Sequence, residues 1–253
     1  MNVGLVLSGG GARGVAHIGV IQALEEFGIK ATMISGTSAG SIVGSLYSHG
    51  HSPKDMLSIV SQATIFSSVR PSLVSGGLLR MDGLGQLLKK HLPDDFSKLK
   101  RPMTIAATDL KKGEMTYFNS GELVPAILSS CCVPGVFSPI SFKGSLFVDG
   151  GVMDNLPVRP LHGKCDFIIG SHCNGVSPTF DVTNFLVVVE RSLLMAIGAN
   201  TLHSKNLCDA VIEPAGLDKF SGFDIGKAKE IFDLGYRYTK ENLGKLNFDK
   251  ILG

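Results

Sequence analysis

A serine stands between small residues in Gly36-Thr37-Ser38-Ala39-Gly40, directly after an apolar run. Small neighbours let a backbone turn sharply and hold a serine hydroxyl clear of the chain. A helix that begins after such a turn points its N–H groups at negative charge that develops beside the serine. The pattern predicts a nucleophilic Ser38 on a strand-to-helix turn, with Gly36 and Gly40 as the turn glycines. The simpler alternative is a serine that only caps the helix.

A second stretch offers backbone N–H groups rather than reactive side chains. It follows the first apolar run and consists of Gly9, Gly10, Gly11, Ala12, Arg13 and Gly14. Consecutive glycines let several N–H groups point to one place, and the following helix adds its positive end. We therefore expect an anion cradle, suited to a phosphate or to a tetrahedral oxyanion. Arg13 would order the loop or face an anionic head group, and a turn without a ligand is the alternative.

The same glycines match the spacing of a dinucleotide-binding loop, Gly9-x-Gly11-x-x-Gly14. That type of site needs an acidic residue at the end of the second strand to hold the ribose. Residues 31–35 contain neither Asp nor Glu, and the loop also lacks the Lys-Ser/Thr pair of a Walker-type loop. The sequence therefore favours an oxyanion over a nucleotide.

A serine hydroxyl must lose its proton before it can attack a carbonyl, so the site needs a base. Asp149 follows the apolar run Leu146–Val148, and Gly150 and Gly151 would let its carboxylate face inward. Partial desolvation would raise the pKa of this carboxyl and make it a stronger base. The alternative is an aspartate that stabilises its own turn.

Histidine is the other candidate base, as part of a Ser–Asp–His triad. His162, His172 and His203 all follow Asp149 in the chain, which is the order found in α/β-hydrolases. His172 is the best placed, because it comes at the end of the apolar run Phe167–Gly170. His17 lies on the first predicted helix, and we interpret it as structural.

Short apolar runs alternate with helical patterns along the chain. The predicted strands are Val3–Leu7, Ala31–Ile34, Pro102–Ala107, Met115–Phe118, Leu146–Val148 and Phe167–Gly170. Helices are predicted from Val15 to Gly28, from Ala39 to Gly50, from Ser52 onward, from Thr183 to Lys205 and within Asp224–Leu243. This alternation predicts a mainly parallel sheet with helices on both faces, and ligands bind beyond the carboxyl ends of such strands. Both glycine motifs fall at that edge.

The composition indicates one large domain with a substantial core, because 44% of the 253 residues are hydrophobic. Twenty-four basic and 22 acidic residues leave a net charge of +2, which gives no reason to expect a nucleic-acid partner. The densest basic stretch, Lys89 to Arg101, is interpreted as a solvated face rather than a patch for anionic membranes. The sequence carries no signal for an oligomeric state.

Five cysteines without a CxxC pair favour buried thiols in a reducing compartment over a disulfide framework. Only His172 and Cys173 are adjacent, and adjacent residues have poor geometry for ligating zinc, so we expect no metal. The sequence enters the predicted strand at Val3 without a basic segment or a cleavage site, so we expect no secretory signal. The stretch Leu123–Phe142 is uncharged but interrupted by prolines, so it is not predicted to span a membrane. We expect a cytoplasmic protein, with peripheral contact at the inner face of the membrane left open.

One segment, Ile65–Leu84, mixes apolar residues with Ser, Gly and Pro and has no clean period. It is either a cover over an apolar site or an ordinary surface connection.

Taken together, the glycine loop, the serine turn and Asp149-Gly150-Gly151 resemble the patatin-like phospholipases, in particular the compact bacterial members. The resemblance covers roughly residues 2–215. It extends to Arg101-Pro102, Ala106-Ala107-Thr108-Asp109-Leu110, Ser129-Ser130-Cys131-Cys132-Val133-Pro134-Gly135 and Asp154-Asn155-Leu156-Pro157-Val158.

This resemblance implies a three-layer α/β/α sandwich in one domain, residues 1–253, whose motif-bearing core ends near residue 215 before a helical tail. It implies Ser38 as the nucleophile and Asp149 as its direct base, without a histidine. Gly10, Gly11 and the adjacent backbone would form the oxyanion hole. The family cleaves acyl esters, often of phospholipids or lysophospholipids, without a metal or cofactor.

The leading hypothesis is a serine lipid-acyl hydrolase that works through an acyl-enzyme. An acyltransferase would use the same serine with an alcohol or thiol as the acceptor. A non-catalytic lipid-binding regulatory module is the third possibility.

Overall fold

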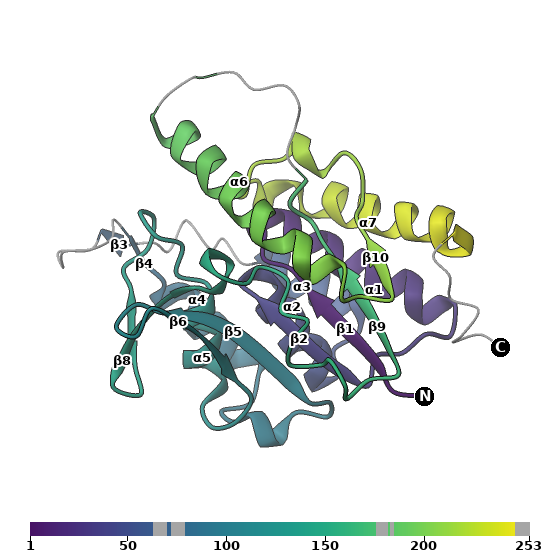
Figure 1. Cartoon of the computed structure of the whole chain (residues 1–253), viewed down its shortest axis with the longest axis horizontal. Helices are drawn as coiled ribbons and strands as arrows, with labels where there is room; N and C mark the ends of the chain where they lie inside the picture. Colours follow the sequence, from purple (N-terminus) through teal and green to yellow (C-terminus); the bar gives the residue numbers. More distant parts are fainter. Residues whose placement is uncertain (63–69, 72–78, 176–181, 183–184, 246–253) are drawn as a thin grey trace.

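The computed structural model describes residues 1–62, 70–71, 79–175, 182 and 185–245. Its main sheet has the strand order β10-β9-β1-β2-β5-β8-β7, with β6 also paired to β5 (Figure 1). The strands of this sheet are β1 Val3–Leu7, β2 Met33–Thr37, β5 Met103–Asp109, β6 Glu114–Phe118, β7 Ile140–Phe142, β8 Ser145–Asp149, β9 Phe167–Ser171 and β10 Ala210–Ile212. A separate antiparallel pair joins β3 Arg70–Pro71 to β4 Leu79–Arg80.

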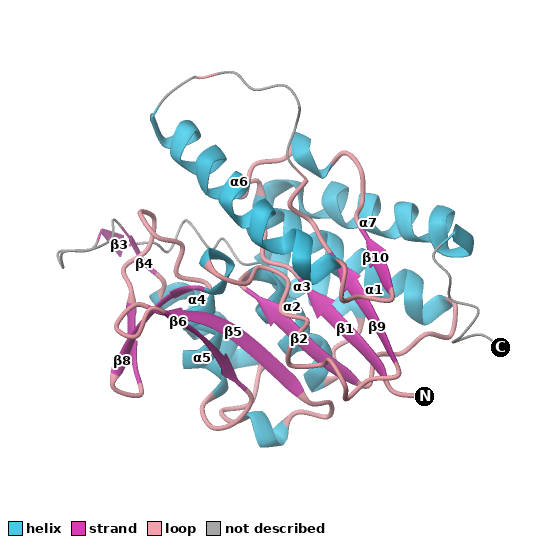
Figure 2. Cartoon of the chain, viewed as in Figure 1, coloured by secondary structure: helices cyan, strands magenta, loops and turns pink. Residues whose placement is uncertain are grey.

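Helices surround this sheet (Figure 2). They are α1 Ala16–Glu26, α2 Ala39–His49, α3 Pro53–Gln62, α4 Asp82–His91, α5 Leu123–Ser130, α6 Phe185–Lys205 and α7 Ala228–Asn242. Short 3₁₀ helices are η1 Gly11–Val15, η2 Phe96–Lys98, η3 Gly150–Val152, η4 Leu217–Lys219, η5 Ile225–Lys227 and η6 Leu243–Lys245. Of these, η3 directly follows β8, which ends at Asp149, and η1 begins within the predicted glycine loop, with three residues between it and β1.

Strand β1 is buried on both sides, which explains its continuous apolar sequence. Val3, Leu5 and Leu7 belong to the larger core, which they form with α1, α2 and α7. Val6 points to the other face, where it packs with Leu156 and neighbouring residues of a second, smaller core. The sheet is therefore covered on both faces, as the sequence predicted.

Helices α1 and α7 approach each other closely at two glycines. A Cβ atom at Gly19 would lie 2.2 Å from the carbonyl oxygen of Phe232, and one at Gly235 would lie 2.2 Å from the carbonyl oxygen of Ala16. Because glycine has no side chain, the two helices pack almost backbone to backbone at these positions, too close for any other residue to fit. This contact fixes the C-terminal helix against the helix that follows the glycine loop.

The strand register brings distant segments together at one edge of the sheet. Parallel pairing sets Leu7 of β1 opposite Gly36 of β2, and Thr37 opposite Ala106 of β5. Antiparallel pairing sets Asp149 of β8 opposite Ala107, the next residue of β5. The ends of β2 and β8 therefore flank the same stretch of β5, Ala106–Ala107, from opposite sides.

The predicted strands and helices are confirmed, with differences that have local causes. The second strand is Met33–Thr37 rather than Ala31–Ile34, because its pairing continues through the small residues before Ser38. The sheet is mixed, because β6, β7 and β8 run antiparallel to their partners. Sequence analysis missed α4, α5, β7 and β10; in α5, Pro125 lies in the first turn, where its missing N–H costs no helical bond. Most of the proposed cover, Ile65–Leu84, lies outside the described residues.

The α1–α7 contact predicts opposite effects for the same substitution at two helical glycines. We expect Gly235→Ala to lower the free energy of unfolding by about 2 kcal/mol, because its Cβ would overlap Ala16. Gly198→Ala in α6 is the matched control, since no described atom outside its own stretch of helix lies within 4 Å of its Cβ position. There alanine should raise stability by roughly 0.5–1 kcal/mol through helix propensity. Denaturant titration measures both, and equal effects would contradict the close packing.

Candidate active site

Ser38 lies in a strained backbone conformation between β2 and α2, with φ 52° and ψ −122°. Such angles are costly for a residue with a side chain and cluster at functional sites. The neighbouring glycines are required by close contacts. A Cβ at Gly36 would lie 2.5 Å from the carbonyl oxygen of Gly40, and one at Gly40 would lie 2.2 Å from that of Leu7. The turn is thereby fixed between the ends of β1 and β2.

Hydrogen bonds from two other serines hold the Ser38 backbone in place. The N–H of Ser38 donates to Oγ of Ser130 at 2.8 Å, and this hydroxyl donates to the carbonyl of Ala106 at 2.7 Å. On the other side, Oγ of Ser41 donates to the carbonyl of Ser38 at 2.6 Å. These bonds offset part of the strain while leaving the Ser38 hydroxyl available.

The Asp149 carboxylate lies next to the Ser38 hydroxyl and shares a side-chain hydrogen bond with it. Its Oδ1 also accepts from the N–H of Gly151 at 2.8 Å. Only 7% of Asp149 is exposed. Burial raises the pKa of its carboxyl to about 6, against the opposing effect of these two hydrogen bonds. The carboxylate is therefore ionised at neutral pH, yet much more basic than an ordinary aspartate.

Some backbone N–H groups of the glycine loop donate hydrogen bonds within the fold, and others do not. Gly9 donates to the carbonyl of Asn155 at 3.2 Å, and Ala12 donates to that of Gly222 at 2.7 Å. Within the described part of the chain, the N–H groups of Gly10 and Gly11 meet no acceptor. These two donors lie in a loop that touches Ser38, because a Cβ at Gly9 would be 3.1 Å from the Cβ of Ser38.

Arg13 is buried and points away from solvent, with only 5% of it exposed. Its Nε donates to the carbonyl of Phe220 at 2.8 Å. The sequence suggests that Arg13 either orders the loop or faces an anionic head group. This geometry matches the first role. Arg13 and Ala12 together tie the loop to the segment Phe220–Gly222, far along the chain.

A buried polar cluster is hydrogen bonded to the start of the glycine loop. Nε2 of His17 donates to the carbonyl of Ser8 at 2.9 Å, and its Nδ1 accepts from Ser171 at 2.8 Å. Burial lowers the pKa of His17 to about 4, so the ring is neutral. The thiol of Cys173 donates to the carbonyl of Gly9 at 3.2 Å, and burial raises its pKa to about 11. His17 and Cys173 are therefore uncharged supports.

The histidines considered as a base lie elsewhere. Nδ1 of His172 donates to Oε1 of Glu213 at 2.7 Å, and this bond, together with Lys205, lowers the pKa of Glu213 to about 2. His172 follows β9, on the other side of β1 from β2, and its ring is hydrogen bonded to Glu213 rather than to Ser38. His162 and His203 are exposed. The structure brings Asp149, and none of these histidines, to Ser38.

Two residues at the site were not singled out from sequence. Ser130 holds the Ser38 N–H, and Asn155 is buried between the glycine loop and the turn after Asp149. Both lie in stretches that carried the family resemblance, but a serine in a helix and an asparagine before a leucine give no local signal of their role.

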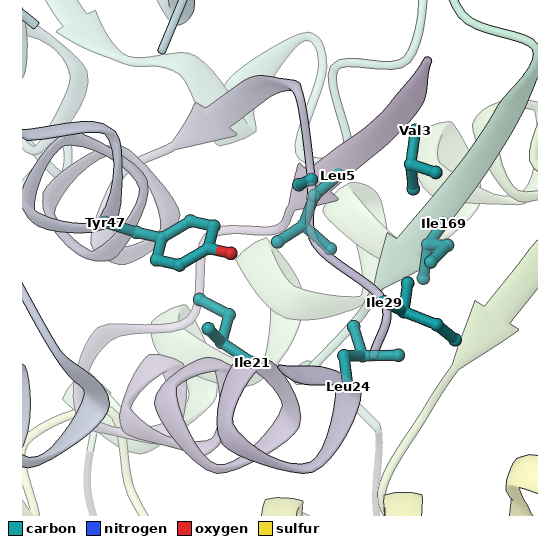
Figure 3. Close-up of a pocket in the computed structure, with 8 residues that line it drawn as sticks. Val3, Leu5, Ile21, Leu24, Ile29, Tyr47 and Ile169 are labelled. Atoms are coloured by element: carbon teal, nitrogen blue, oxygen red, sulfur yellow. The ribbon is translucent and has the colours of Figure 1, made fainter. Parts of the chain in front are cut away.

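A small apolar cavity lies away from this site (Figure 3). It is lined by Val3, Leu5, Ile21, Leu24, Ile29, Ala31, Tyr47 and Ile169. The Tyr47 hydroxyl donates to Glu25 at 3.0 Å. Because it lies beside the start of β1, at the opposite end of the strand from the glycine loop, this cavity is a packing defect of the core rather than part of the site.

Two kinds of feature are absent from the part of the chain that the structure describes. No group of three or more His, Cys, Asp or Glu side chains there has the geometry to hold a metal ion. None of the helices there combines the length and the apolar character needed to cross a membrane.

Comparison with known proteins identifies the family. The sequence profile of the patatin-like phospholipases matches residues 5–162, and the chain belongs to this family. It is 38% identical over 177 residues to an uncharacterised NTE family protein of Mycobacterium tuberculosis, covering 68% of this chain and 49% of that protein. It is 29% identical over 290 residues to lysophospholipase nte1 of Neurospora crassa, covering 99% of this chain and 19% of that protein.

Among solved structures, VipD from Legionella pneumophila is similar, with a TM-score of 0.48 and 17% identity over 92% of this chain and 67% of that one. The chain thus spans about half the length of its mycobacterial relative and about a fifth of its fungal one.

The buried Asp149 carboxyl predicts a stability difference that depends on pH. The native state keeps this proton up to about pH 6, whereas the unfolded chain loses it near pH 4, so the wild type loses stability as pH rises through that window. We expect Asp149→Asn to be more stable than the wild type above pH 7, by ~3 kcal/mol at the limit for two pKa units. Near pH 4 the advantage should vanish. Thermal and denaturant unfolding at both pH values measure it, and a difference independent of pH would contradict the burial argument.

Proposed function

We propose that the chain is a serine acyl-ester hydrolase acting on lipids, with a Ser38–Asp149 dyad. The observation that carries the proposal is a strained serine whose hydroxyl is hydrogen bonded to a buried carboxylate with a pKa of about 6. A nucleophile needs a base within hydrogen-bond reach, and this carboxylate is the group in that position.

In the first half of the reaction, Asp149 takes the proton of the Ser38 hydroxyl while Oγ attacks the ester carbonyl. The carbonyl oxygen of the resulting tetrahedral intermediate carries a negative charge. Asp149 then passes its proton to the leaving alkoxide, the ester C–O bond breaks, and an acyl-Ser38 ester remains. The raised pKa favours both steps, because the base binds the proton firmly enough to remove it and then releases it.

The N–H groups of Gly10 and Gly11 stabilise the negative charge of the intermediate. Their lack of an acceptor within the described chain supports this role, because donors fixed in place before the reaction need no rearrangement. The remainder of the loop, Gly9, Ala12, Arg13 and Gly14, positions these two donors through its own bonds and through tight contact with α2, where a Cβ at Gly14 would lie 2.4 Å from the Cβ of Ala39.

In the second half, a water molecule takes the place of the leaving alcohol. Asp149 removes a proton from the water, which attacks the acyl carbonyl, and the proton then returns to Ser38 Oγ as the fatty acid leaves. The same donors stabilise the second oxyanion. Gly150 and Gly151 keep the turn compact beside the base: a Cβ at Gly150 would lie 2.3 Å from the carbonyl oxygen of Ala106.

The lipid substrate class is supported by family membership and by the fungal relatives, which carry the name lysophospholipase. An uncharged ester of a fatty acid has the carbonyl that this arrangement can attack. We therefore propose phospholipid or lysophospholipid acyl esters, met at a membrane surface that the chain contacts peripherally.

The dyad predicts which variants lose activity. We expect Ser38→Ala and Asp149→Asn to lower the hydrolysis of p-nitrophenyl acyl esters by at least ~10³-fold, because each removes a reacting group. His172→Asn keeps a donor for Glu213 and should retain activity within about threefold, since His172 lies outside the dyad. Rates over a series of acyl lengths measure all three. An inactive His172→Asn enzyme with unchanged folding would support a triad instead.

The pKa of the base predicts the pH profile. Only the ionised carboxylate of Asp149 accepts the serine proton, so kcat/KM should rise with a slope of one and a midpoint near pH 6. Above pH 7.5 it should be flat, because the base is then fully ionised. A profile already flat at pH 5 would contradict a base with a raised pKa.

A further inference from the structure

Asn155 is a buried amide at the junction of the two halves of the proposed site. It follows η3, the turn after Asp149, and only 2% of it is exposed. Its backbone carbonyl accepts the N–H of Gly9, so this residue links the base turn to the glycine loop. A backbone carbonyl is available at any residue type, and this link therefore does not explain an asparagine.

The side-chain amide of Asn155 lies among the reacting groups. Its Oδ1 is 2.5 Å from the Cβ position of Gly9, and the Cβ of Ser38 is 3.1 Å from the same point. The same Oδ1 is 3.0 Å from the Cβ position of Gly151, with Oδ1 of Asp149 at 3.1 Å from that point. The amide oxygen thus faces the Cα hydrogens of two glycines, one beside the nucleophile and one beside the base.

The nitrogen of this amide has no partner. Nδ2 of Asn155 is buried and donates to no group of the described chain. An unpaired buried donor costs roughly 1–3 kcal/mol, and such groups persist where a function needs them. A purely structural asparagine would pair its amide nitrogen, whereas this nitrogen has no partner among the described residues.

We propose that Asn155 Nδ2 is a further hydrogen-bond donor to the carbonyl oxygen of the substrate as that oxygen becomes an oxyanion. This inference rests on the proposed function. Together with the N–H groups of Gly10 and Gly11, Asn155 would complete a three-donor oxyanion hole, with a donor from the base side of the site. The cost of leaving Nδ2 unpaired in the free enzyme is recovered when charge develops on the substrate, which is how a donor favours the transition state over the ground state.

The test is the kinetics of Asn155→Ala on a p-nitrophenyl ester, beside the wild type and Ser38→Ala. Loss of a donor used in the transition state should lower kcat by about 10²-fold, with KM changed less than about threefold. The pH midpoint of kcat/KM should stay where it is in the wild type, because the donor acts on the substrate and not on Asp149. Labelling by a fluorophosphonate, in which Ser38 Oγ displaces fluoride from phosphorus, should slow by a similar factor.

Asn155→Asp is the second variant, and it keeps the size of the side chain and one oxygen while replacing the donor with an acceptor. It should lose at least as much kcat, and it decides the question if Asn155→Ala does not fold. The matched control is Ser48→Ala, which removes another buried side-chain group without a partner, at the far end of α2 from Ser38. This control should leave kcat unchanged.

The outcomes separate the two proposals. A wild type that is inactive, or as active as Ser38→Ala, overturns the proposed function. An active wild type with a folded Asn155→Ala enzyme within about threefold of its kcat overturns the Asn155 inference alone. A rise in KM at constant kcat, or a shifted pH midpoint, also overturns it, because the side chain would then bind the ground state or tune Asp149.

Discussion

The close contact between the start of α2 and the end of β1 is the constraint on which the rest of the site depends. Gly40 lies so near the carbonyl of Leu7 that no side chain fits between them, and two residues earlier the chain turns at Ser38 with a positive φ. A non-glycine residue in such a conformation costs roughly 1–3 kcal/mol. The hydrogen bonds of Ser130 and Ser41 with the Ser38 backbone offset part of that cost. The fold can therefore keep this strained turn, which holds the Ser38 hydroxyl clear of its own backbone.

The Asp149 carboxylate is subject to a different compromise. Strand β8 enters antiparallel and ends at Asp149, which places a carboxylate where burial works against its charge. Two hydrogen-bond donors, the Ser38 hydroxyl and the Gly151 N–H, offset only part of the effect of burial on the pKa. If they offset all of it, Asp149 would be an ordinary aspartate with little basicity. A site of this kind exchanges stability for reactivity, as functional sites commonly do.

The C-terminal part of the chain contributes to the site although it carries no motif. Carbonyls of Phe220 and Gly222 accept bonds from Arg13 and Ala12, and α7 packs on α1 through Gly19 and Gly235. The glycine loop is therefore bonded to the Phe220–Gly222 segment, which precedes α7. Its donors depend on packing that involves residues beyond the part matched by the family profile.

The sequence alone determined the features that arise from neighbouring residues. Alternating strand and helix patterns, the Gly36–Gly40 turn and the glycine loop follow from local sterics and periodicity, which a short stretch encodes by itself. Sequence left open whether Ser38 pairs with Asp149 or with His172, and it gave no role to Ser130 or Asn155. Strand order and register decide these contacts: Thr37 and Asp149 pair with neighbouring residues of β5, Ala106 and Ala107, whereas the His172 ring is bonded to Glu213. Only the tertiary structure decides them, because contacts between residues far apart in the chain depend on how the whole sheet assembles.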